Sequence, residues 1–188
     1  MNLLPLSGTL LAIGLAWLIA AAVADIKERL IYNELVLYVV GVGITLRLVS
    51  TPGLLWLSVG GSIFLLVVLG VFARLGMIGG GDAKLIAASM LLLPPQHDAQ
   101  LMLNIALVGG LLSCFYLLVR IVLRRTAIAQ IGPPNGRATD PSIGCYGGEL
   151  ARIHAGEPIP YAVAILGGTV YSILTEAISC IYATSCLL

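Results

Sequence analysis

Two aspartates are the residues of this chain whose surroundings best suit chemistry. Asp25 ends a long apolar run, and Asp82 follows the glycine run Gly79-Gly80-Gly81. Two carboxyl groups that meet in apolar surroundings cannot both ionise cheaply, so one keeps its proton and the pair can hold a water molecule. The ionised group then takes a proton from that water, and the neutral group donates one to a carbonyl oxygen. These are the steps of peptide-bond hydrolysis.

The composition indicates that lipid is the main solvent of this chain. Of 188 residues, 59% are hydrophobic and only 10% are charged, with a mean hydropathy of +1.04. A soluble domain carries about 25% charged residues. The sequence therefore predicts an all-α fold, a polytopic membrane helix bundle with about six transmembrane helices, formed as a single membrane-embedded domain over residues 1–188. The net charge of +1, without a basic run, predicts no nucleic-acid partner.

Apolar runs mark the expected spans, and most approach the roughly 20 residues that a helix needs to cross hydrocarbon. The predicted segments are Leu3–Ala24, Leu35–Val49 (starting near Leu30), Leu54–Ala73, Ala83–Leu93, Leu101–Leu123 and Ile159–Tyr182. Thr51-Pro52-Gly53 and Leu93-Pro94-Pro95 should break the helix between spans. Glycine pairs inside spans, such as Gly167-Gly168, should let helices approach closely. The segment from Ala83 is only about half of a membrane thickness long, so Asp82 should lie below the membrane surface.

The basic residues predict an orientation. If six helices alternate, nine of the ten Lys and Arg residues fall on one side and only Arg47 falls on the other. Basic residues favour the cytoplasm, so both termini should lie outside. The segments 25–34 and 74–84 and a loop at about 124–158 should be cytoplasmic. Asp25 and Asp82 then share the cytoplasmic side.

Each aspartate also has a plainer interpretation. Asp25 can be an ordinary charge at the lipid headgroups, paired with Lys27 or Arg29. Asp82 is well placed to be the N-cap of a helix that begins at Ala83. The glycine run does not meet the spacing of a nucleotide-binding phosphate loop. The cysteines form no C-x-x-C pair, so no metal or cofactor is predicted.

Three segments carry a resemblance to a known family. Asp25-Ile-Lys-Glu-Arg29-Leu-Ile31-Tyr-Asn33 resembles the first signature of the type IV prepilin peptidases, which are membrane aspartyl proteases. Gly79-Gly80-Gly81-Asp82-Ala83-Lys84-Leu85 resembles their second signature, the GxGD motif. Pro160-Tyr161-Ala162-Val163-Ala164-Ile165 resembles a third short segment. The resemblance implies that Asp25 and Asp82 are catalytic. The supporting residues that it implies are Gly79, Gly80, Gly81, Lys84, Asn33 and Pro160.

The resemblance also implies a substrate and a location. The substrate would be a prepilin or pseudopilin, cut where its basic cytoplasmic leader meets its apolar helix, in the bacterial cytoplasmic (inner) membrane. The chain lacks the paired C-x-x-C ligands and the added domain of the bifunctional members, so it resembles the short, peptidase-only branch linked to tight-adherence (Flp-type) pili. It has Tyr32 where the family commonly has proline. The sequence assigns no oligomeric state.

Two other functions fit the same features. A small transporter or proton-coupled channel component also uses broken helices and buried carboxylates, and it would be supported by an inverted repeat. An inactive partner in pilus assembly would keep the fold without needing both acids. Cleavage of a prepilin, and its dependence on each aspartate, distinguishes these alternatives from a peptidase.

Overall fold

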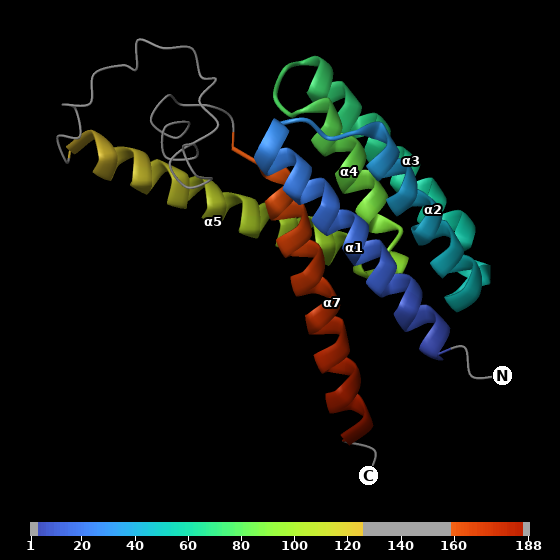
Figure 1. The fold of residues 1–188 in the computed structure, drawn as a ribbon. Helices are drawn as coiled ribbons and strands as arrows, with labels where there is room; N and C mark the ends of the chain where they lie inside the picture. The colour runs from blue at the N-terminus through green and yellow to red at the C-terminus, as the bar shows by residue number, and fades with distance from the viewer. Residues whose placement is uncertain (1–3, 126–158, 186–188) are drawn as a thin grey trace. The chain divides into compact units, whose positions relative to one another are not determined.

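The computed structural model describes residues 4–125 and 159–185. Regular structure in these residues is helical throughout, which confirms the predicted all-α class (Figure 1). The α-helices are α1 (Leu4–Glu28), α2 (Asn33–Ser50), α3 (Leu55–Arg74), α4 (Gly80–Met90), α5 (Asp98–Arg125) and α7 (Tyr161–Ser185). Two short 3₁₀ helices, η1 (Pro52–Leu54) and η2 (Pro95–His97), stand at the predicted proline breaks.

Five of these helices are long and apolar enough to cross a membrane, which makes the chain a multi-pass membrane protein. Helices suit this setting because every backbone N–H and C=O inside the span is satisfied within the same segment. The remaining described α-helix, α4, has eleven residues and is not among the candidate spans. The sequence had predicted a short fourth segment, and the structure places its start three residues earlier, at Gly80 instead of Ala83.

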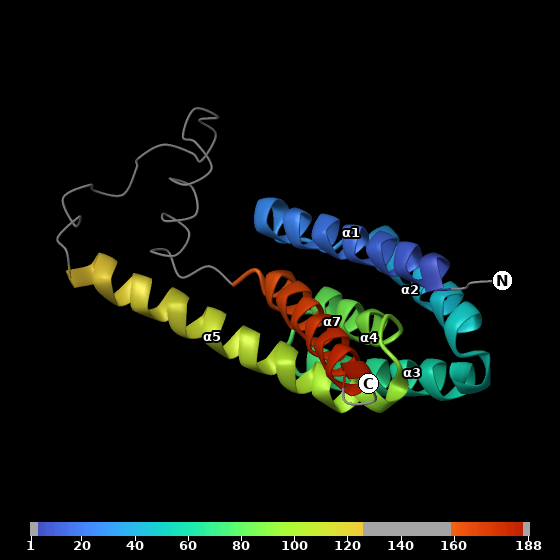
Figure 2. The same ribbon diagram turned by 90° about the horizontal axis from the view of Figure 1, so that it is seen from below.

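One compact unit comprises residues 1–109 and 160–188. Within it, α1 packs against α2 and α7, while α4 packs against α2, α3 and α7 (Figures 1 and 2). Leu85–Leu93 is buried without interruption as a result. The short, little-charged helix α4 is thus enclosed by the long ones. Residues Gly110–Ile159 form a second unit, of which the structure describes the continuation of α5 to Arg125.

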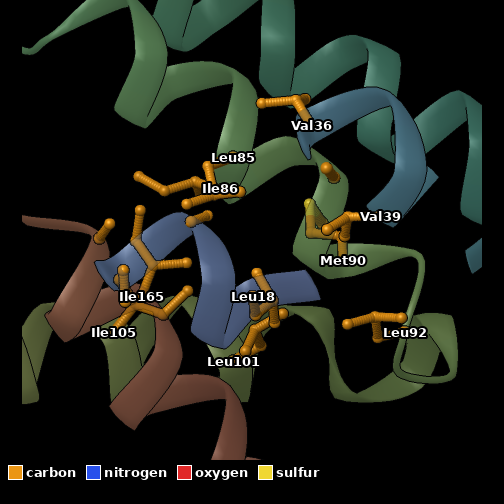
Figure 3. Packing of buried hydrophobic residues seen from close by; sticks show 14 of the residues in the cluster. Leu18, Val36, Val39, Leu85, Ile86, Met90, Leu92, Leu101, Ile105 and Ile165 are labelled. Atoms are coloured by element: carbon orange, nitrogen blue, oxygen red, sulfur yellow. The ribbon is translucent and has the colours of Figure 1, made fainter. Parts of the chain in front are cut away.

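The core of the first unit is built from aliphatic side chains of several helices (Figure 3). Leu18 of α1, Val39 of α2, Leu85 of α4 and Ile165 of α7 are each at most 1% exposed. Large apolar residues elsewhere face outward, such as Trp56 and Phe64 of α3. In a membrane protein this outward apolar face is the surface that lipid covers.

A predicted close helix contact is confirmed at Gly168. A Cβ atom on Gly168 would lie 2.6 Å from the Cα of Ile105, so α7 and α5 approach backbone to backbone at this point. Nearby, the side-chain amide of Asn104 donates a hydrogen bond to Ser172 Oγ over 2.8 Å. Small residues with an interhelical hydrogen bond are a common way to join helices in lipid.

The connections between helices bring four chain segments to one end of the first unit. They are the last turn of α1, the first turns of α2 and α4, and the first turn of α7 (Figure 1). The predicted loop at 124–158 lies outside the described residues, apart from the last two residues of α5. Asp25 lies in the last turn of α1 and Asp82 in the first turn of α4, so both aspartates lie at this end of the first unit.

Candidate active site

The end of α1 turns sharply after Asp25. The helix continues to Glu28, and Arg29 then adopts a φ of 54°, in the left-handed region that often follows a helix end. Its N–H donates to the carbonyl oxygen of Asp25 over 2.9 Å. Tyr32 follows with φ −68° and ψ 133° and is the N-cap residue of α2. Proline fixes φ at about −65°, so Tyr32 holds the backbone conformation that proline would impose.

The beginning of α4 differs from the sequence expectation. Gly79 is the N-cap residue, and Asp82 lies in the first helical turn with no capping hydrogen bond. The predicted N-cap role of Asp82 is therefore wrong, because Gly80 and Gly81 already belong to the helix. A Cβ on Gly79 would lie 2.5 Å from Asp82 Oδ2. The missing side chain at Gly79 thus makes room for the Asp82 carboxyl group.

The segments that carry the two signatures touch each other. A Cβ on Gly81 would lie 3.0 Å from Cβ of Ile31, so α4 starts close against the turn after α1. Lys84 Nζ donates a hydrogen bond to Asn33 Oδ1 over 2.8 Å, and both side chains are exposed. These contacts fix the start of α4 against the start of α2. Four residues of the predicted site, Asn33, Gly79, Gly81 and Lys84, contribute to this geometry.

Asp25 is buried against the last helix. Its side chain is 7% exposed, and Oδ2 accepts a hydrogen bond from the backbone N–H of Ala162 over 3.1 Å. Pro160 is buried just before α7, and Ala162 is the second residue of that helix. Asp25 is therefore not an exposed charge at the end of a helix. It lies at the positive end of the α7 dipole.

The two carboxyl groups interact electrostatically. Burial raises the pKa of Asp82 to about 6, and the charge of Asp25 acts in the same direction. Arg29 supplies positive charge near Asp25, and Tyr161 of α7 lies within reach of the charge of Asp82. A negative charge on Asp25 therefore favours a proton on Asp82, and an acid–base pair requires such a difference between its two groups. In residues 4–125 and 159–185, no group of three or more His, Cys, Asp and Glu side chains is placed to hold a metal ion.

A comparison with protein-family models identifies the chain. The model described as the type IV leader peptidase family matches residues 12–118, which is more than half of the 188 residues. The chain belongs to the type IV leader peptidase family. Membership implies an aspartic-type peptidase and prepilin substrates, as the sequence resemblance had suggested. The searches of curated proteins and of solved structures returned no match.

The matched region of the leader peptidase family contains both aspartates and both of their signature segments, whereas Pro160 lies beyond it. The structure nevertheless brings the start of α7 to Asp25 through the amide of Ala162. A Cβ atom added to Gly80 would meet no atom within 4 Å, so its side of α4 is open within the described residues. All the predicted site residues thus lie at one end of the first unit.

Sequence reasoning missed two groups at this site. The amide of Ala162 has no side-chain signature, so only the resemblance of its segment to a family motif pointed to it. Arg29 was seen as a partner for a surface charge, and its left-handed backbone conformation was not foreseen. Non-glycine residues rarely adopt that conformation, so no local pattern pointed to it.

Proposed function

We propose that this protein is a membrane aspartic endopeptidase that removes the leader peptide of type IV prepilins or pseudopilins, with Asp25 and Asp82 as its catalytic pair. One observation carries the proposal. In a chain of the leader peptidase family, two carboxyl groups from separate segments lie at the same end of the bundle, close enough for the charge of Asp25 to raise the pKa of Asp82.

The reaction needs one ionised and one protonated carboxyl group. The ionised group takes a proton from water as the water oxygen attacks the scissile carbonyl carbon, and the neutral group gives its proton to the carbonyl oxygen. The tetrahedral intermediate then collapses. The C–N bond breaks, the leaving nitrogen takes the proton gained from water, and a hydroxyl proton returns to the other acid. The pair ends in its starting state.

The start of α4 suits an extended substrate. Gly80 leaves space beside the helix, and backbone without side chains allows a peptide to approach closely. In the first unit, Lys27, Arg29, Arg74 and Lys84 lie toward the same end as the aspartates. Basic residues favour the cytoplasmic side, so we propose cleavage at the cytoplasmic face of the bacterial inner membrane, where a basic leader would remain.

The test is cleavage of a co-expressed prepilin by single variants. Asp25→Asn and Asp82→Asn keep the size and polarity of each side chain but remove its proton chemistry. Each should reduce processing by about 10²–10⁴-fold, the usual contribution of general acid–base catalysis. The matched control is Glu34→Gln, which neutralises an exposed carboxylate at the same end of the bundle. It should process prepilin at the normal rate.

Membrane insertion of every variant is measured in parallel by membrane extraction and immunoblotting. Full processing by either aspartate variant would rule out the catalytic pair. Processing lost equally in Glu34→Gln would also count against it, because a general effect of charge at this end would then explain the losses.

A further inference from the structure

The two aspartates have different surroundings, and the difference begins with Asp25. Its Oδ2 accepts the Ala162 N–H at the start of α7, a helix of 25 residues. A hydrogen bond donated to a carboxylate favours the charged form, and the positive end of a helix dipole does the same. Arg29 adds a positive charge from the turn that follows α1. Burial opposes a negative charge on Asp25, whereas the start of α7 and the Arg29 side chain both favour one.

Asp82 lacks a comparable donor. It lies in the first turn of α4, so the dipole of its own helix acts on it, but among the described residues no N–H or O–H donates to its carboxyl group. The carboxyl lies instead beside the bare backbone of Gly79. The titratable groups near it are Asp25 of α1 and Tyr161 of α7, and Lys84 of its own helix bonds to Asn33. An ionised Asp25 therefore favours the neutral form of Asp82.

We infer that the pair has fixed roles: Asp25 is the ionised base that activates water, and Asp82 is the protonated acid that donates to the substrate carbonyl. This assignment rests on the proposed function. In the first step Asp25 gains a proton from water and Asp82 loses its proton to the carbonyl oxygen. In the second, Asp25 gives its proton to the leaving nitrogen and Asp82 recovers one from the intermediate. The first turn of α7 sets this asymmetry.

The test is chemical labelling of the resting protein without substrate. Dicyclohexylcarbodiimide adds to protonated carboxyl groups in apolar sites and leaves an adduct that peptide mass spectrometry locates. The full chain, purified in detergent, is labelled over a range of pH values. Asp82 should be labelled at pH values where Asp25 remains unmodified. Labelling of Asp25 in preference to Asp82, or equal labelling of both at every pH, would overturn the assignment.

Two variants test the cause. In Asp25→Asn the side chain can still accept the Ala162 N–H, but its negative charge is gone, so labelling of Asp82 should shift to lower pH. In Ala162→Pro the donor itself is removed at a position in the first helical turn, where proline is tolerated. Asp25 should then become labelled. Ala162→Gly keeps the amide, so its labelling of Asp25 and Asp82 should match that of the parent protein.

Unchanged labelling in both Asp25→Asn and Ala162→Pro would show that α7 and Asp25 do not set the asymmetry. Should Ala162→Pro fail to fold, the parent protein and Asp25→Asn still decide the matter. The readout is independent of cleavage. Processing of prepilin by Asp25→Asn would refute the proposed function, while the labelling pattern alone decides which acid holds the proton.

Discussion

At the scale of single residues, the candidate site depends on small groups that leave space. Gly79 leaves room for the Asp82 carboxyl, and Gly81 lets α4 approach Ile31. The amide of Ala162 then reaches Asp25. A peptidase pair needs both carboxyl groups within reach of one water molecule, and these three contacts determine where the groups lie.

The contact at Gly79 predicts the effect of adding one methyl group. Gly79 has φ −65° and ψ 135°, which alanine adopts without strain, so Gly79→Ala acts mainly through its Cβ, 2.5 Å from Asp82 Oδ2. The carboxyl group must move, and a misplacement of about 1 Å can cost 10²-fold in rate. Prepilin processing should fall by about that factor, while thermal unfolding in detergent changes little.

Gly70→Ala in α3 is the matched control for Gly79→Ala, because a Cβ on Gly70 meets nothing within 4 Å. Its processing rate should equal that of the parent protein. If Gly79→Ala processed prepilin at the parent rate, the position of Asp82 against Gly79 would have no part in the reaction.

The protonation of the pair predicts a bell-shaped pH profile of kcat/KM. At low pH the base of the pair is protonated and no group activates water. Burial raises the pKa of Asp82 to about 6, so activity declines as pH rises through that region and Asp82 loses the proton that it donates. Bound substrate excludes water from Asp82, which should move the alkaline limb of kcat to a higher pH. A profile that stays flat across both limbs, with chemistry rate-limiting, would contradict the paired roles.

At the scale of elements, the position of Asp82 depends on how the short helix α4 is held in the bundle. It is too short to span a membrane and is held at both ends by groups from α2. At its start, Asn33 accepts the hydrogen bond of Lys84. Beyond its last residue, the buried Arg47 donates from Nε to the Leu91 carbonyl over 3.1 Å and from Nη2 to the Leu92 carbonyl over 2.9 Å. Arg47 thereby satisfies carbonyl groups that the end of a short helix leaves without partners.

The sequence predicted the existence of these elements better than their ends. Apolar runs and proline breaks located all the described helices, because hydrophobicity and chain stiffness are local properties. The start of α4 was missed, since glycine is a weak helix former and the packing of Gly81 against Ile31 is a property of the folded chain. Arg47 was counted as a lone charge on the outer side, and its two backbone partners are more than forty residues away.

Replacement of Arg47 should destabilise the bundle. Arg47→Met keeps the apolar stem but leaves the carbonyls of Leu91 and Leu92 unsatisfied, at a cost on the order of 2 kcal/mol. Arg47→Lys should fall between Met and the parent, since an ammonium group lacks the planar fork that reaches two acceptors. Thermal unfolding in detergent measures both.

Thr51→Val serves as the control for the Arg47 series. The Thr51 hydroxyl lies 3.4 Å from Arg47 Nη1, which is the longest and weakest of the three hydrogen bonds that Arg47 makes in the described part of the chain. The Thr51→Val variant should have the smallest effect. An Arg47→Met variant as stable as the parent would show that the Leu91 and Leu92 carbonyls find other partners.

At the scale of the whole molecule, the basic residues are distributed unevenly between the two ends of the bundle. Within the first unit, Lys27, Arg29, Arg74 and Lys84 lie toward the end that carries the aspartates, and Arg47 lies toward the other. Composition and charge alone predicted a multi-pass membrane protein, because both are sums over the chain. The hydrogen bond between Asp25 and Ala162 and the electrostatic interaction between Asp25 and Asp82 could not be predicted in the same way, since they join three segments that only the folded bundle brings together.

This distribution predicts that α3 crosses the membrane with its last residue in the cytoplasm. Single cysteines at its two ends test this in a background whose four native cysteines are replaced by serine. Gly53→Cys, before α3, should react with a membrane-impermeant maleimide on intact spheroplasts. Met77→Cys, which follows α3 and is 69% exposed, should react only after lysis. The opposite pattern would place Asp82 outside the cell, where a leader retained in the cytoplasm could not reach it.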